Sequence, residues 1–85
     1  MNELLYEQCR SLIDPTLPNI ANISNCIALL YHEMNNINWL GFYICDDTKQ
    51  ECTLGPFQGK VACTRIPYGK GVVGICASTS TTQLV

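Results

Sequence analysis

The sequence predicts an α+β fold, with two N-terminal helices packed on a central antiparallel sheet. Two observations carry this prediction. Apolar residues recur at helical spacing up to residue 34, and from residue 38 the pattern changes to short apolar runs separated by turn residues. Helices followed by a block of strands are typical of α+β domains. With 85 residues, the chain forms one domain at most.

Composition excludes several classes of protein. Hydrophobic residues make up 47% and charged residues 14%, which indicates a packed chain and argues against disorder. The net charge is −2 and no run of like charge is present, so we expect no nucleic-acid partner. The longest run of apolar residues uninterrupted by glycine, 26–31, is far shorter than the roughly 20 residues that span a bilayer. The first residues do not resemble a secretion signal, so the sequence predicts no membrane association and a cytoplasmic location.

Residues 1–13 are expected to form a short amphipathic helix, because Leu5, Cys9 and Leu12 fall on one helical face. The prolines in 14–18 end it. A second helix is predicted from Pro18–Asn19, with Thr16 or Asn19 as its cap. Its apolar stripe consists of Ile20, Ile23, Ile27, Leu30 and Met34, and it fades at Asn35 and Asn36.

The strands are expected after the second helix. Residues 38–45 are aromatic and apolar throughout, as in a strand covered on both faces. The remaining predicted elements are a turn at 46–50, a strand at 52–54, a loop at 55–59, a strand at 61–66, a glycine-rich turn at 67–71, a helix at 72–77, a linker at 78–82 and the start of another strand at 83–85. The last feature predicts a domain that is incomplete at its C-terminus, so that 1–85 is its N-terminal portion.

Cysteine is abundant, with six residues: Cys9, Cys26, Cys45, Cys52, Cys63 and Cys76. The wide gaps between them include no C-x-x-C, and His32 is the sole histidine, so we expect no metal site. In a reducing compartment these residues would be thiols. A secreted, disulfide-linked mini-protein is the alternative, and it requires oxidised cysteines.

Strand alternation places Trp39, Gly41, Tyr43 and Cys45 on one face. A glycine between two large aromatic residues leaves a notch one residue wide. Such a notch could hold a small apolar group such as a thioether methyl, because sulfur packs well on ring edges. The alternative is a helix packed closely over the glycine.

Cys63 is the thiol that the sequence singles out for chemistry. Arg65 would share its strand face, and a nearby cation lowers the pKa of a thiol and raises its reactive fraction. The alternative is a half-buried structural cysteine that behaves as a small hydrophobic residue.

The glycines of 69–74 suggest a phosphate-binding loop, but the order G-x-x-x-x-G-K-[ST] is absent. The G-x-G-x-x-G spacing of these glycines does not lie in the context of a dinucleotide-binding motif. We therefore expect a structural turn there. His32 stands alone on its helix and is expected to be a solvated surface residue.

Four ordered segments together resemble the free methionine-(R)-sulfoxide reductase family. Ile37–Tyr43 is similar to the family's I-N-W-x-G-F-Y strand, and Leu54–Lys60 to its L-G-P-F-Q-G signature. Ala62–Pro67 is similar to A-C-x-x-I-P, and Gly69–Val72 to G-[KR]-G-V. The resemblance extends over this whole chain but over about the first half of the family's domain.

The resemblance implies a GAF fold and reduction of free L-methionine-(R)-S-oxide by a thiolate, with thioredoxin as the reductant and no bound cofactor. It implies that Trp39 and Tyr43 form an aromatic wall around the substrate methyl, and that Cys63 is the resolving cysteine. The sequence leaves the oligomeric state of the protein open, and a homodimer is one candidate.

Two departures from the family pattern matter. The family has a redox cysteine directly after G-[KR]-G-V, where this chain has Val73; Cys76, three residues on, is a candidate replacement. The nucleophile of the family lies in an H-I-A-C-D-like segment that 1–85 does not contain. The chain alone is thus expected to be inactive, and a non-catalytic GAF-type binding or interaction module is the alternative function.

Overall fold

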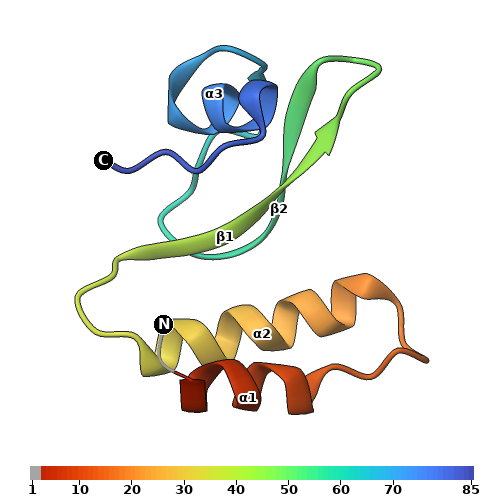
Figure 1. Cartoon of the computed structure of the whole chain (residues 1–85), viewed down its shortest axis with the longest axis vertical. Helices are drawn as coiled ribbons and strands as arrows, with labels where there is room; N and C mark the ends of the chain where they lie inside the picture. The colour runs from red at the N-terminus through yellow and green to blue at the C-terminus, as the bar shows by residue number, and fades with distance from the viewer. Residues whose placement is uncertain (1–2) are drawn as a thin grey trace. The chain divides into compact units, whose positions relative to one another are not determined.

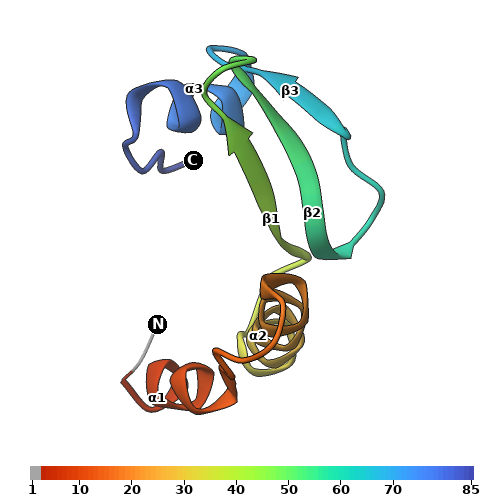
Figure 2. The same ribbon diagram turned by 90° about the vertical axis from the view of Figure 1, so that its right-hand side faces the viewer.

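The computed structural model describes residues 3–85 (Figure 1). Its elements follow the predicted order of two helices, a sheet and a short helix: α1 (Glu3–Leu12), α2 (Asn19–Glu33), β1 (Trp39–Asp46), β2 (Glu51–Gly59), β3 (Arg65–Pro67) and α3 (Gly71–Thr79). The strands form one sheet in the order β1-β2-β3 (Figure 2). This arrangement confirms the α+β prediction. The chain divides into two compact units, the first running to Phe42 and including Pro56–Lys60, and the second comprising Tyr43–Gly55 and Val61–Val85.

In the first unit, α1 and α2 form an antiparallel pair (Figure 1). Leu5 and Ile27 are buried there, with exposed fractions of 6% and 3%. Their burial follows from the apolar faces that the sequence shows. None of the described helices is long and apolar enough to cross a membrane.

The connection between these helices is stabilised by Asp14 and Asn22. The Asp14 backbone N–H donates to Asn22 Oδ1 at 3.0 Å, and Asn22 Nδ2 donates to the Asp14 carbonyl at 2.9 Å. Thr16 donates its backbone N–H and its hydroxyl to the Asp14 carboxylate, which lowers the pKa of Asp14. The prediction that Thr16 or Asn19 caps α2 is therefore wrong: Pro18 occupies the N-cap position without a side-chain bond.

Strand β2 is longer than predicted and includes the expected loop 55–59. The glycine and proline of this stretch indicated a turn, but a proline is tolerated where a strand needs no donor. Leu54 donates its N–H to the Thr64 carbonyl on the β3 side, and the N–H that Pro56 lacks would point the same way. The ladder with β3 involves only 51–53, so Pro56 removes no bond from it.

Strand β3 lies further along the chain than predicted and is shorter than 61–66. Its antiparallel register pairs Glu51 with Pro67, Cys52 with Ile66 and Thr53 with Arg65. The preceding residues lie outside the strand, and Val61 is 94% exposed. The β-propensity of Val61 thus did not decide its structure, because pairing partners determine strand boundaries more than propensity does.

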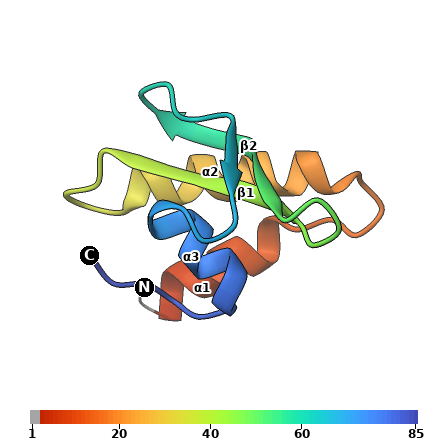
Figure 3. The same cartoon turned by 90° about the horizontal axis from the view of Figure 1, so that it is seen from above.

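Helix α3 is longer at both ends than the predicted 72–77. It follows a turn in which Gly69 donates to the Gly74 carbonyl at 2.9 Å and Gly74 donates to the Lys70 carbonyl at 3.0 Å. The helix ends at Ser80, whose φ is 55°. The predicted strand start at 83–85 is wrong, because these residues form no regular element (Figure 3).

Candidate functional site

In the first unit, Trp39 is held at the start of β1. Its ring stacks on Phe57 with a centroid separation of 5.5 Å and an interplanar angle of 15°. Its Nε1 donates to the Lys60 carbonyl at 3.1 Å. The sequence does not indicate either contact, because Phe57 lies in the predicted loop 55–59 and Lys60 directly follows it.

Gly41 lies directly under this aromatic pair. A Cβ at this position would lie 2.5 Å from Phe57 Cβ and 2.6 Å from Trp39 Cη2. The space beside Gly41 that strand alternation leaves open is therefore taken by these two side chains. Glycine is needed at position 41 because any side chain there would overlap the Trp39 ring and Phe57.

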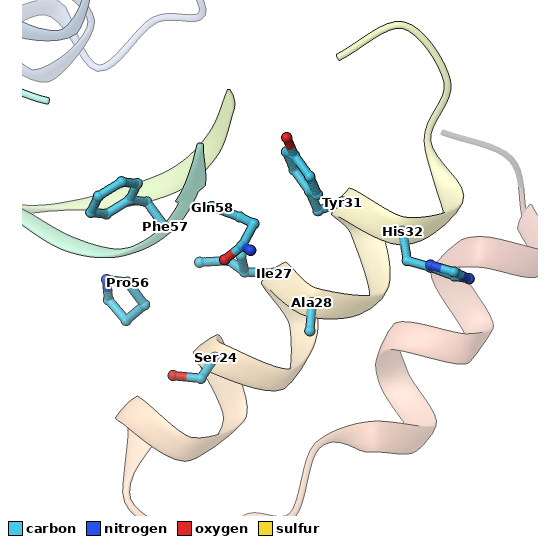
Figure 4. Close-up of a pocket in the computed structure, with 8 residues that line it drawn as sticks. All are labelled: Ser24, Ile27, Ala28, Tyr31, His32, Pro56, Phe57 and Gln58. Atoms are coloured by element: carbon cyan, nitrogen blue, oxygen red, sulfur yellow. The ribbon is translucent and has the colours of Figure 1, made fainter. Parts of the chain in front are cut away.

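A hollow of about 370 Å³ lies beside this cluster, between α2 and the end of β2 (Figure 4). Figure 4 shows Phe57 and Pro56 on the strand side and Ile27 and Tyr31 on the helix side. The complete lining is Ser24, Ile27, Ala28, Tyr31, His32, Pro56, Phe57 and Gln58. The His32 side chain is 84% exposed, as expected of a surface histidine.

In the second unit, Tyr43 contacts the segment that carries Cys63. The Tyr43 hydroxyl donates to the Cys63 carbonyl at 2.8 Å. Desolvation raises the pKa of Tyr43, and the thiols of Cys63 and Cys52 add to the effect. Cys63 itself is exposed. The structure thus brings together one aromatic and one thiol residue that the sequence singled out separately.

Tyr43 also lines a cavity of about 620 Å³ that includes Cys76. Val73, which stands where the resembled family has a cysteine, contributes to the same wall. The full lining is Tyr43, Cys45, Asp47, Tyr68, Val72, Val73, Cys76, Ala77, Ser80, Thr81, Thr82 and Gln83. A cavity with aromatic, aliphatic and a few polar side chains is typical of a small-molecule site.

The predicted strand face shared by Cys63 and Arg65 does not exist. Cys63 precedes β3, whereas Arg65 begins it. Arg65 Nε lies 3.5 Å from Glu51 Oε2 on the neighbouring strand, so the guanidinium pairs with a carboxylate. The expectation that Arg65 activates Cys63 was wrong because it assumed that the strand began at Val61.

Tyr68 also lines the cavity of the second unit, and nothing in the sequence indicated that it would. Its hydroxyl donates to Asp47 Oδ1 at 2.6 Å, and this hydrogen bond, with desolvation, raises the pKa of Tyr68. The two residues are separated by the whole of β2 and β3, so no local pattern could have indicated their contact.

Two further expectations concern metal and phosphate. Within residues 3–85, no group of three or more His, Cys, Asp or Glu side chains could hold a metal ion. The glycine-rich turn at 69–74 is closed by its own backbone hydrogen bonds. Gly74 is needed for packing there, since a Cβ on it would lie 2.4 Å from the Pro67 carbonyl oxygen.

The order of two helices, a three-stranded antiparallel sheet and a short helix is that of half of a GAF domain. A GAF sensor protein from Burkholderia vietnamiensis superposes with a TM-score of 0.89 at 50% identity, over 96% of this chain and 50% of that chain. The fold is therefore GAF-like, as the resemblance implied.

Two comparisons narrow this class. Free methionine-R-sulfoxide reductase from Saccharomyces cerevisiae is 42% identical over 88 residues, covering 98% of this chain and 49% of the yeast protein. The structure of free methionine-R-sulfoxide reductase from Neisseria meningitidis in complex with its substrate has a TM-score of 0.77 at 38% identity, over 92% of this chain and 46% of that one. No family model matches the chain. The chain is thus homologous to free methionine-R-sulfoxide reductases and GAF-domain proteins, and it spans about half the length of these relatives.

Proposed function

We propose that this protein takes part in the thiol-dependent reduction of free L-methionine-(R)-S-oxide to L-methionine, with Cys63 as the resolving cysteine. One observation supports this most directly: the hydroxyl of Tyr43 donates a hydrogen bond to the backbone carbonyl of Cys63 at 2.8 Å. The choice of substrate rests on homology to proteins named as free methionine-R-sulfoxide reductases. In the second unit Tyr43 is proposed as a substrate-binding residue, and in the first unit Trp39, with Gly41 beside its ring, is proposed as another.

The chemistry needs two thiols. A nucleophilic thiolate attacks the sulfoxide sulfur, and the sulfoxide oxygen takes up a proton. This oxygen is transferred to the cysteine sulfur as the transient S–S bond and the original S–O bond break, which releases methionine and leaves a sulfenic acid on the enzyme. The Cys63 thiol then attacks that sulfenic sulfur, releases water and forms a disulfide. Thioredoxin reduces the disulfide by thiol–disulfide exchange, which restores both thiols. No bound cofactor is required, and we place the reaction in the reducing environment of the cytoplasm.

Cys76 is proposed as a second redox thiol. It is exposed and shares the cavity with Tyr43, while Val73 at the family's cysteine position cannot take part in exchange. Because Cys76 lies one helical turn beyond Val73, its side chain projects on a neighbouring part of the same helix face.

Residues 1–85 contain no H-I-A-C-D-like segment, so a polypeptide of these residues alone is proposed to be inactive. The test is thioredoxin-coupled turnover of free methionine-(R)-sulfoxide by the full-length protein and by this polypeptide. Turnover by the 85-residue polypeptide would contradict the assignment of the nucleophile to a different segment.

The role of Cys63 is tested by Cys63→Ser in the full-length protein. We expect methionine release of about one equivalent per protein followed by loss of thioredoxin-coupled turnover, because the sulfenic acid can form but the thiol proposed to convert it into a disulfide is absent. Cys9→Ser is the matched control, since Cys9 lies on α1 in the other unit, and its turnover should equal that of the unmodified protein. Continued turnover of Cys63→Ser at the unmodified rate would exclude a resolving role.

A non-catalytic GAF-type binding module is the second candidate function. The cavity that includes Tyr43 and the similarity to a GAF sensor protein favour it. Calorimetry with L-methionine and with both sulfoxide epimers distinguishes the two, because binding of these ligands by full-length protein without turnover would support the module.

A further inference from the structure

A pair of thiols lies outside the proposed redox residues. Cys45 is near the end of β1 and Cys52 near the start of β2. Their Sγ atoms are 3.6 Å apart across the hairpin. Both residues belong to the second unit, and neither falls on a motif of the resembled family.

The two thiols differ in their access to solvent. Cys52 is fully buried, with 0% exposure, whereas Cys45 is exposed and lines the cavity of the second unit. Desolvation raises the pKa of Cys52 to about 11, and its hydrogen bond with Cys45 adds to the shift. A dissolved reagent can therefore reach Cys45 but not Cys52, and Cys52 remains protonated at neutral pH.

The hairpin holds the two sulfur atoms close together. The Asp46 carboxylate accepts from the backbone N–H groups of Thr48 and Lys49 at 3.0 and 3.1 Å, which fixes the turn directly after Cys45. On the other side, Ile66 of β3 is the register partner of Cys52. Because these contacts hold the backbone beside both cysteines, we expect the sulfurs to approach each other by side-chain rotation rather than by rearrangement of the strands.

We propose that Cys45 and Cys52 form a reversible intramolecular disulfide by exchange with low-molecular-weight disulfides. The Cys45 thiolate attacks one sulfur of the external disulfide, which breaks and releases one thiolate, leaving a mixed disulfide on Cys45. Cys52 then attacks the Cys45 sulfur, gives up its proton to the released thiolate, and expels the second half of the reagent. The protein loses two electrons and two protons, and the external disulfide becomes two thiols.

The test treats the full-length protein with glutathione disulfide, blocks remaining thiols with N-ethylmaleimide and digests with trypsin and Glu-C. Cleavage after Glu33, Lys49, Glu51 and Lys60 separates the two cysteines onto the peptides 34–49 and 52–60. We expect these peptides to be joined by a disulfide, with the protein carrying no glutathione at either position. Alkylated, unlinked 52–60, or 52–60 linked to a peptide other than 34–49, would overturn the proposal.

Two variants test the assigned order of attack. With Cys52→Ser, Cys45 should retain glutathione as a stable mixed disulfide. With Cys45→Ser, the buried Cys52 should remain an unmodified thiol until the protein is denatured. Glutathionylation of Cys52 in the folded Cys45→Ser variant would contradict the order.

Cys26→Ser is the matched control, and it should leave the linkage of 34–49 to 52–60 unchanged. This readout is a peptide linkage and requires no reductase activity. The disulfide between Cys45 and Cys52 can therefore be refuted without affecting the proposed role of Cys63. In the same way, the role of Cys63 can be refuted without affecting this disulfide.

Discussion

At the scale of single residues, the Trp39 ring leaves no room for a side chain at Gly41 or at Gly59 in the first unit. A Cβ on Gly59 would lie 2.7 Å from Trp39 Cδ1 and 2.8 Å from the Asn38 carbonyl oxygen. The backbone φ of Gly59 is +135°, which residues with a side chain rarely adopt. The space beside Gly41 is filled by the same Trp39 ring and by Phe57. The G-F-Y and F-Q-G segments of the sequence are therefore coupled through the packing of Trp39.

Gly41→Ala should destabilise the protein by about 1–3 kcal/mol, the usual cost of forcing extra atoms into a packed site. The added methyl would meet the Cβ of Phe57, which is fixed to the backbone of β2 and cannot rotate away. Urea unfolding measures the change. Gln58→Ala, at an exposed position of β2 next to Phe57, is the control and should shift stability by less than about 0.5 kcal/mol. Equal midpoints for both variants would show that the strands separate without cost.

The pKa of Cys52 predicts a loss of stability at alkaline pH. Its folded-state pKa, about 11, lies above the ordinary value of 9.0, so the unfolded chain releases this proton first as the pH rises. The stabilising contribution is complete below pH 9 and is lost as the pH rises through 11. The raised pKa of Tyr68 acts in the same direction.

Urea midpoints measured at increasing pH test this prediction. The decline above pH 9 should be shallower in Cys52→Ala than in the unmodified protein, because the variant has no thiol to titrate there. Lys49→Gln, on the exposed turn of the same hairpin, serves as the control and should keep the original slope. A Cys52→Ala slope that matches the unmodified protein would refute the assignment.

At the scale of elements, α1, α2 and β1 followed from the sequence, whereas the boundaries of β2, β3 and α3 did not. Periodicity located α1 and α2 within a few residues because each buries one face within the first unit. The extent of β2 depended on where β3 pairs with it, and that register is a long-range property. The contacts of Tyr43 with Cys63 and of Tyr68 with Asp47 join residues 20 and 21 positions apart, so local patterns could not reveal them.

The packing of α3 on β3 gives a prediction that opposes helix propensity. Alanine is favoured over glycine in a helix by about 1 kcal/mol, so propensity alone predicts that Gly74→Ala stabilises. A Cβ there would instead lie 2.4 Å from the Pro67 carbonyl oxygen, a backbone atom. We expect net destabilisation, seen as a lower thermal midpoint. Ser78→Ala, on the exposed part of α3, is the control and should leave the midpoint equal or slightly higher. An increase for Gly74→Ala would show that α3 lies loosely on β3.

At the scale of the whole molecule, the described residues bury few apolar side chains. Leu5, Ile27 and Cys52 are the buried hydrophobic residues within 3–85. Large apolar side chains remain exposed in both units, among them Ile13, Leu17 and Ile20 in the first and Ile44, Val61 and Ile75 in the second. Exposed apolar surface of this kind is typical of interaction sites and of aggregation-prone proteins.

We therefore expect a polypeptide of residues 1–85 to self-associate, with oligomers that grow with concentration in sedimentation velocity. Ile44, 53% exposed on β1, is one of the residues responsible, because a sheet with an uncovered apolar side chain pairs readily with another copy. Ile44→Lys should raise the concentration at which oligomers form. Thr53→Lys, which adds the same charge at an exposed polar position of β2, should change it less. A monomer at every concentration, with one sharp thermal transition, would show that these side chains do not drive association.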